Sequence, residues 1–179
     1  AGIGRPSSLG KIVKGIKKYN PNVIIQYHGH SGPGFSVASS LEVARCGADI
    51  IDVSMEPLSW GTTHADLLTV HEILKDDGFK VKDIDRNAYM EVKSLTQEFI
   101  DDYLGFYINP KNRLMNSLLI ESGLPGGMMG SLMNDLEKSH ISVNKWLKKN
   151  EKNEISLDNL FSSLLDEVKY IWPIMGYPP

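Results

Sequence analysis

Two histidines separated by a single glycine, His28 and His30, are the residues of this chain best suited to do chemistry. Side chains at positions i and i+2 of an extended segment point to the same side, about 6.5 to 7 Å apart along the backbone, so both imidazoles can reach one metal ion. Gly29 between them lets neighbouring backbone approach closely. The spacing predicts a metal site, and a pair of surface or hydrogen-bonded loop histidines is the alternative.

A third histidine, His64, has a comparable place in the sequence. It follows the second predicted strand and precedes a helix, so its position makes it a possible third ligand. The simpler function of this segment is to begin the helix, with Thr62 or Thr63 as the cap. The remaining histidines, His71 and His140, fall in helical stretches, where we expect a structural role.

The segments that must position these histidines alternate between strand and helix patterns. Apolar β-rich runs indicate strands over 23–27 and 49–53, and helical spacing is found over 8–18, 37–46 and 65–74. Both strands are apolar on successive residues, which is typical of parallel strands covered on both faces. The histidine pair then lies at the carboxyl end of a parallel strand, where such architectures place their active sites.

The second half of the chain, from about residue 85, is predicted to be mainly helical, because strand runs disappear and amphipathic stretches take over. These stretches cover 89–104, 114–122, 128–138 and 157–175. We expect the polar stretch at 148–154 to be an exposed loop.

The composition indicates an ordinary globular protein, since 41% of the 179 residues are hydrophobic and 23% are charged. The net charge of −3 argues against a nucleic-acid partner. Cys46 is the only cysteine, which excludes an intrachain disulfide and favours a reducing cytoplasmic location. The sequence has no apolar run of about 18 residues or more and no signal-peptide pattern.

The βα units predicted here are too few to close a barrel, which typically needs about 250 residues. We therefore expect the chain to be part of a larger whole, with the remaining strands removed or on another polypeptide. The first residue, Ala1, and the abrupt Tyr177-Pro178-Pro179 ending lead to the same expectation.

Several segments in register resemble the carboxyltransferase domain of biotin-dependent enzymes, and they span nearly the whole chain. They are Tyr27-His28-Gly29-His30, Gly47 to Asp52, Leu58 to Thr63, Leu124 to Met129 and Gly176 to Pro179. The family includes pyruvate carboxylase, the oxaloacetate decarboxylase alpha subunit and the carboxyltransferase subunit of transcarboxylase. The resemblance is to the C-terminal half of that domain.

The resemblance implies an α/β fold, in which residues 1–84 are the last βα units of a TIM (β/α)8 barrel and residues 85–179 a mainly helical extension. It also implies a catalytic zinc, manganese or cobalt ion at the carboxyl end of the barrel. His28 and His30 match the family's two histidine ligands. The other two, an aspartate and a carbamylated lysine, precede this chain, as does the arginine that holds pyruvate, so this chain alone is expected to be inactive.

The activity that the resemblance implies is transfer of a carboxyl group between biotin and pyruvate or oxaloacetate. In relatives a hydroxyl residue after Pro-Gly-Gly moves the proton. That position is Gly130 here, which leaves the adjacent Ser131 as the candidate. Ser31 replaces a common aspartate and Gly29 a common threonine. These departures predict a divergent branch, with another 2-oxo acid or an acyl-CoA-linked reaction as the alternative to pyruvate.

The partners implied are a biotin carrier domain or subunit, the missing N-terminal half of the barrel and further copies of the chain in a homo-oligomer. Membrane association is expected only through partner subunits. Two other functions stay open. One is a metal-dependent aldolase or lyase of the related His-x-His barrel superfamily, and the other is a non-catalytic module for subunit interaction.

Overall fold

A pair of short parallel strands lies at the centre of the first part of the chain. The computed structural model describes residues 2–120 and 129–176. Strand β1 (Gln26–Tyr27) pairs with β2 (Ile50–Ile51) in parallel, with Gln26 opposite Ile50. The predicted strands are confirmed in place and direction but are shorter, because the described residues supply only this one pairing to hold them extended.

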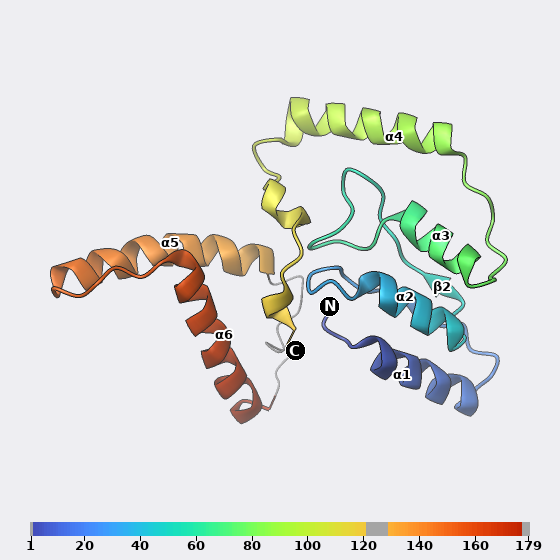
Figure 1. Ribbon diagram of the computed structural model, residues 1–179, viewed down its shortest axis with the longest axis horizontal. Helices are drawn as coiled ribbons and strands as arrows, with labels where there is room; N and C mark the ends of the chain where they lie inside the picture. The colour runs from blue at the N-terminus through green and yellow to red at the C-terminus, as the bar shows by residue number, and fades with distance from the viewer. Residues whose placement is uncertain (1, 121–128, 177–179) are drawn as a thin grey trace.

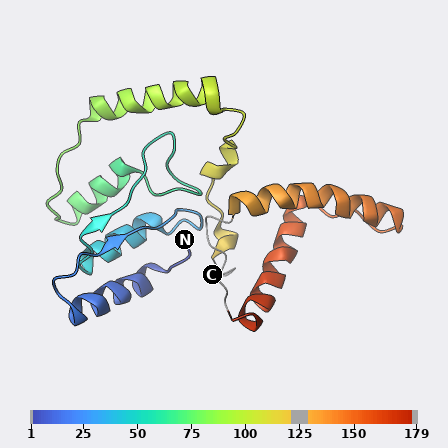
Figure 2. The same cartoon turned by 180° about the vertical axis from the view of Figure 1, so that it is seen from behind.

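Three helices cover one face of the strands. They are α1 (Pro6–Tyr19), α2 (Ser36–Arg45) and α3 (Leu67–Asp76), close to the predicted segments, and Figures 1 and 2 show them on one side of the sheet. Val13 of α1 and Val43 of α2 are buried there against Ile25, Tyr27 and Ile51 of the strand segments. Burial of these apolar side chains is the main force that holds α1 and α2 on the sheet.

The opposite face of the sheet is not covered by the described residues, so the prediction that both faces are covered stays a prediction. Ile24 is 72% exposed and Ile50 46% exposed. Gln26 lies on the same side, since side chains alternate along a strand, and its amide nitrogen donates to Asp52 at 2.7 Å. Of the successive apolar residues in these strands, only those that face the helices are covered by the described part of the chain.

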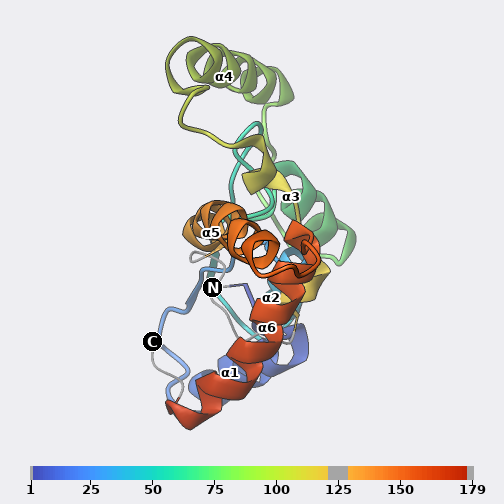
Figure 3. The same ribbon diagram turned by 90° about the vertical axis from the view of Figure 1, so that its left-hand side faces the viewer.

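Helix α4 (Arg86–Phe99) is tied to the first part of the chain by a buried hydrogen bond. The hydroxyl of Tyr89 donates to Asp66 at 2.6 Å and accepts from the backbone N–H of Glu56 at 3.1 Å. Asp66 also caps α3, accepting from the N–H of Leu68 at 2.9 Å. Figure 3 shows α4 at one end of the molecule, so this contact fixes a helix with few neighbours.

The predicted helix at 114–122 is wrong over its described part. After the π-helical turn η1 (Ile100–Leu104), the chain forms only two 3-10 turns, η2 (Pro110–Arg113) and η3 (Ser117–Leu119). Two backbone groups of this segment bond to distant loops. The N–H of Asn116 donates to the carbonyl of Gly32 at 2.8 Å, and the carbonyl of Asn112 accepts from Thr62 at 2.8 Å. Tertiary hydrogen bonds thus replace the helical ones.

The chain continues as a hairpin of two helices, α5 (Met129–Lys149) and α6 (Leu157–Ile174). Leu136, Phe161 and Leu165 form its core together with Leu119. Helix α5 runs eleven residues beyond the predicted end at 138, and the loop between the two helices spans 150–156. The described helices include none with the length and apolar character of a membrane span.

His140 belongs to the turn of this hairpin. Its ring nitrogen lies 2.7 Å from the carbonyl oxygen of Ile155, and the Asn144 side chain bonds both backbone groups of the same residue at 2.9 Å. The structural role expected for His140 fits these contacts. The predicted domain boundary after residue 84 falls just before α4 and stays a prediction.

We expect Tyr89→Phe to lower the free energy of unfolding by about 1.5 to 3 kcal/mol, because it removes the hydroxyl that donates to the buried Asp66 carboxylate. Burial and the bond to Asp66 raise the pKa of Tyr89 to about 12, so the hydroxyl is protonated at neutral pH. The measurement is urea unfolding. Tyr103→Phe is the matched control, because Tyr103 lies in η1 directly after α4 and is 68% exposed. Equal effects of the two changes would contradict the role of Tyr89.

Candidate metal centre

Three histidine rings meet beyond the carboxyl end of β1. His28 and His30 follow the strand directly, and His64 comes from the loop between β2 and α3. The ring centroids are 5.2 Å apart for His28 and His30, 4.4 Å for His28 and His64, and 4.9 Å for His30 and His64. One nitrogen from each ring lies within 4.8 Å of the other two. The sequence-predicted pair is thus brought together, and a third imidazole joins it.

Each of the three rings is held through Nδ1 by an oxygen atom. The acceptors are a carboxylate oxygen of Asp52, 2.8 Å from His28, the carbonyl oxygen of Thr62 beside His30, and that of Gly29, 2.9 Å from His64. Carbonyl and carboxylate oxygens only accept hydrogen bonds, so Nδ1 must carry the proton in every ring. Nε2 then has the lone pair, which is the arrangement of histidines that bind a metal.

The loop that carries His64 is bonded directly to the turn that follows His30. The N–H of Ser31 donates to the carbonyl of Thr63 at 2.7 Å, and the N–H of Trp60 donates to the carbonyl of His64 at 2.8 Å. Ser31 is fully buried, and its hydroxyl donates to Ser36 of α2 at 2.8 Å. The small, neutral side chain of Ser31 therefore stabilises the turn and does not point toward the three histidines as a ligand.

The same loop contains an unusual backbone. Trp60 has a φ of 75°, which bulky residues rarely adopt. Its ring N–H donates to Glu56 at 3.1 Å, and Glu56 also binds Ser59 and Arg113. At Gly61, with a φ of 52°, a Cβ atom would stand 1.9 Å from the carbonyl oxygen of Asn112. A loop that keeps such a conformation is fixed by its surroundings.

The electrostatics of the centre favour a neutral His30 ring and an ionised Asp52 carboxylate. Burial lowers the pKa of His30, and repulsion from His64 adds to this effect. The pKa of Asp52 is lowered by the hydrogen bond from Gln26 and then by that from His28. Imidazole binds metals in its neutral form, so at neutral pH the ring is ready to act as a ligand.

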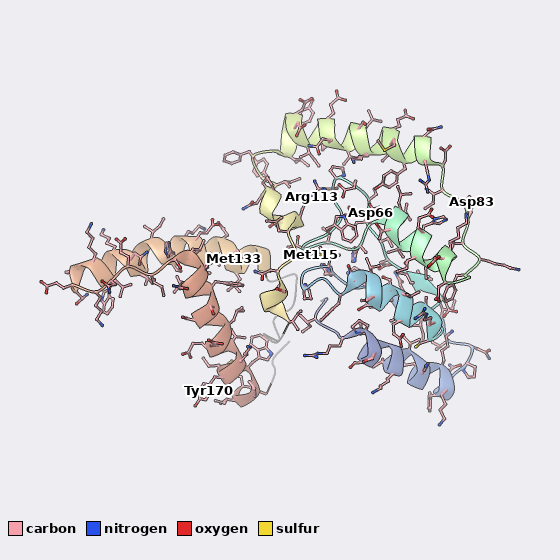
Figure 4. The ribbon with its side chains drawn as sticks, in the orientation of Figure 1. Asp66, Asp83, Arg113, Met115, Met133 and Tyr170 are labelled. Atoms are coloured by element: carbon pink, nitrogen blue, oxygen red, sulfur yellow. The ribbon has the colours of Figure 1, made fainter. Side chains whose placement is uncertain are left out.

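A cavity of about 500 Å³ lies beside the histidines. Thr62, whose carbonyl oxygen holds His30, lines it together with Asn112. Met115 and Met133, labelled in Figure 4, line it from the segment before η3 and from α5. Glu137 of α5 adds a carboxylate. The cavity therefore joins the histidine loops to the C-terminal helices and has the size of a small-molecule site.

The catalytic candidate Ser131 falls within α5, but its side chain lies outside the described part of the structure, as does the segment 124–128. Residue spacing did not predict that Asp52 and the carbonyls of Gly29 and Thr62 hold the rings. The position of Asp52 could have predicted this role, because Asp52 lies near the end of the second predicted strand, beside the end of the first.

No family model matches the chain. It is 23% identical over its whole length to a pyruvate carboxylase subunit of Methanothermobacter thermautotrophicus, and the match spans 28% of that protein. The carboxyl transferase domain of Rhizobium etli pyruvate carboxylase, solved with pyruvate and biocytin, superposes with a TM-score of 0.62. The chain is a homologue of pyruvate carboxylase subunits and related carboxyltransferases. These homologues are enzymes.

The superposition with the Rhizobium etli domain covers 81% of this homologue of the carboxyltransferases and 24% of the other chain, with 20% sequence identity. At this identity the superposition shows a common fold. A probable 2-isopropylmalate synthase of Glycine max is 28% identical over 132 residues, which are 69% of the chain and 23% of the plant protein. The chain thus spans about a quarter of the length of each of these three proteins.

We expect nitrogen-15 NMR to find the Nδ1–H tautomer at His28, His30 and His64 above neutral pH, although the Nε2–H form dominates for free imidazole side chains. The physical reason is that each Nδ1 faces an oxygen acceptor. Asp52→Ala should return only His28 to a mixture of tautomers. A dominant Nε2–H form at either of the other two rings would contradict the geometry.

Proposed function

We propose that this chain carries the metal centre of a biotin-dependent carboxyltransferase, which moves a carboxyl group between biotin and pyruvate or oxaloacetate. The observation that carries the proposal is the convergence of His28 and His30 at the carboxyl end of β1, with Nδ1 of each ring held by an oxygen. The homology to the Methanothermobacter pyruvate carboxylase subunit supports the reaction class.

The residues present fit a divalent metal such as zinc, manganese or cobalt. Nε2 of His28 and of His30 would bind it, and the spread of 4.8 Å is one that small side-chain rotations can close to bonds of about 2.1 Å. A cation held there supplies Lewis-acid polarisation of the carbonyl oxygen of a 2-oxo acid. Asp52 keeps the His28 ring oriented and in the tautomer that binds.

The neighbouring cavity would receive the 2-oxo acid and the biotin ring. Its walls combine the backbone around Thr62 with Met133, Asn134 and Glu137 of α5. Ser131 precedes these residues in the same helix, which supports it as the hydroxyl that passes a proton between biotin and the acid. A biotin carrier domain or subunit is the partner that this role requires.

Strands outside this chain would complete the barrel in this proposal. The exposed apolar side chains Ile24 and Ile50 on the open face of the sheet support it, because such residues are normally covered. The parallel order of β1 and β2 with helices on one face matches a segment of a TIM barrel wall. Residues 1–84 would belong to the barrel and 85–179 to the helical extension.

The similarity to a probable 2-isopropylmalate synthase supports a second function, a metal-dependent enzyme that forms or breaks carbon–carbon bonds. The two functions differ in their co-substrate. A carboxyltransferase decarboxylates oxaloacetate in a reaction that biotin stimulates, whereas a synthase of the second kind releases free coenzyme A from an acyl thioester. Thiol release without biotin-stimulated decarboxylation would favour the synthase.

We expect the complete enzyme to lose its metal and its carboxyl transfer when His28 and His30 are both changed to Ala, because two strong ligands disappear together. The affinity of the enzyme for the metal should fall about 100-fold or more. Elemental analysis and an oxaloacetate decarboxylation assay measure the two losses.

His140→Gln is the matched control for this experiment, because His140 lies in the α5–α6 hairpin and keeps a donor for the Ile155 carbonyl when it becomes glutamine. The control should keep both metal and activity. Metal retained by the His28 and His30 double variant would defeat the proposed centre.

A further inference from the structure

We infer that His64 is a third ligand of the metal at His28 and His30, so that this chain by itself provides a centre of three histidines. The inference rests on the proposed function, which places a divalent cation at the first two rings. It adds a ligand and, through that ligand, the class of metal.

The position of the His64 ring is the first support. Its centroid is 4.4 Å from that of His28 and 4.9 Å from that of His30, whereas the His-x-His pair itself is 5.2 Å apart. His64 therefore lies closer to each of the two rings than they lie to each other. All three can contribute a nitrogen to one small volume.

The orientation of the ring is the second support. Nδ1 of His64 donates to the carbonyl oxygen of Gly29, the residue between the other two histidines, at 2.9 Å. This bond fixes the ring plane and leaves the Nε2 lone pair free of the proton. The third ligand is thus oriented by the backbone of the motif that provides the first two.

The backbone of His64 is held on both sides. Its N–H donates to the hydroxyl of Ser54 at 3.3 Å, and its carbonyl accepts from Trp60 at 2.8 Å. Ala65, the next residue, is only 2% exposed. A fixed backbone with a fixed ring leaves little freedom to lose when a metal binds, which strengthens binding.

The chemistry of the three donors sets the metal class. Three neutral imidazoles are borderline-soft nitrogen ligands, which suit zinc, cobalt and nickel, whereas magnesium and calcium prefer oxygen. Three histidines by themselves also leave coordination positions for a substrate oxygen and for ligands from outside this chain. We expect the chain to bind Zn²⁺ about 1000-fold or more tightly than Mg²⁺.

The test that counts ligands is proton NMR of the chain loaded with Co²⁺. Each coordinated ring keeps an Nδ1–H on its oxygen acceptor, so three strongly shifted resonances should be present in H₂O and vanish in D₂O. Only two such resonances would overturn His64 as a ligand while keeping the centre at His28 and His30. This measurement uses the unaltered chain and does not depend on whether a variant folds.

The second test compares Co²⁺ dissociation constants and visible spectra of His64→Ala, His28→Ala and the control His140→Gln. We expect about 100-fold weaker binding and a weaker absorption band for the first two, and no change for the control. Normal binding by His64→Ala beside a loss in His28→Ala would overturn the inference and keep the proposed function. Absence of Co²⁺ binding by the unaltered chain would overturn the centre of three histidines, and absence of a bound metal from the complete enzyme would overturn both.

Discussion

The parallel pairing of β1 with β2 is the constraint on which the rest of the centre depends. It places the ends of both strands side by side, and the N–H of Asp52 donates to the carbonyl of Tyr27 at 2.9 Å. The carboxylate of Asp52 therefore stands next to the His28 ring, which begins where the first strand ends. Without this register Asp52 would not hold the His28 ring, and the loops that follow the two strands would not begin side by side.

Oxygen acceptors, more than apolar packing, organise the centre. One side chain and two backbone carbonyls orient the three rings, and these carbonyls belong to the very loops that carry the histidines. Each loop thus positions the ring of the other, since Gly29 holds His64 and Thr62 holds His30. Reciprocal support of this kind keeps the three rings close together, with one nitrogen of each within 4.8 Å of the other two, before any metal is present.

The molecule joins this centre to its helical half through a small number of specific contacts. Arg113 binds Glu56 in the His64 loop, and the N–H of Asn116 donates to the Gly32 carbonyl in the His30 turn. The segment between α4 and α5 is therefore shaped by the loops that it touches. The cavity lies where these contacts meet α5, so the helical half contributes one wall of the space beside the histidines.

Local sequence determined much of the fold: helices α1, α2, α3 and α6 follow the apolar periodicity, and the spacing of His28 and His30 put both rings at the end of one strand. Tertiary structure alone decided that the ring of His64, 35 residues beyond Gly29, lies beside the rings of His28 and His30. It also decided that the N–H of Asn116 bonds to the distant Gly32 carbonyl in place of a helical partner. Periodicity and spacing describe neighbours along the chain, whereas these contacts depend on how strands and loops are brought together in space.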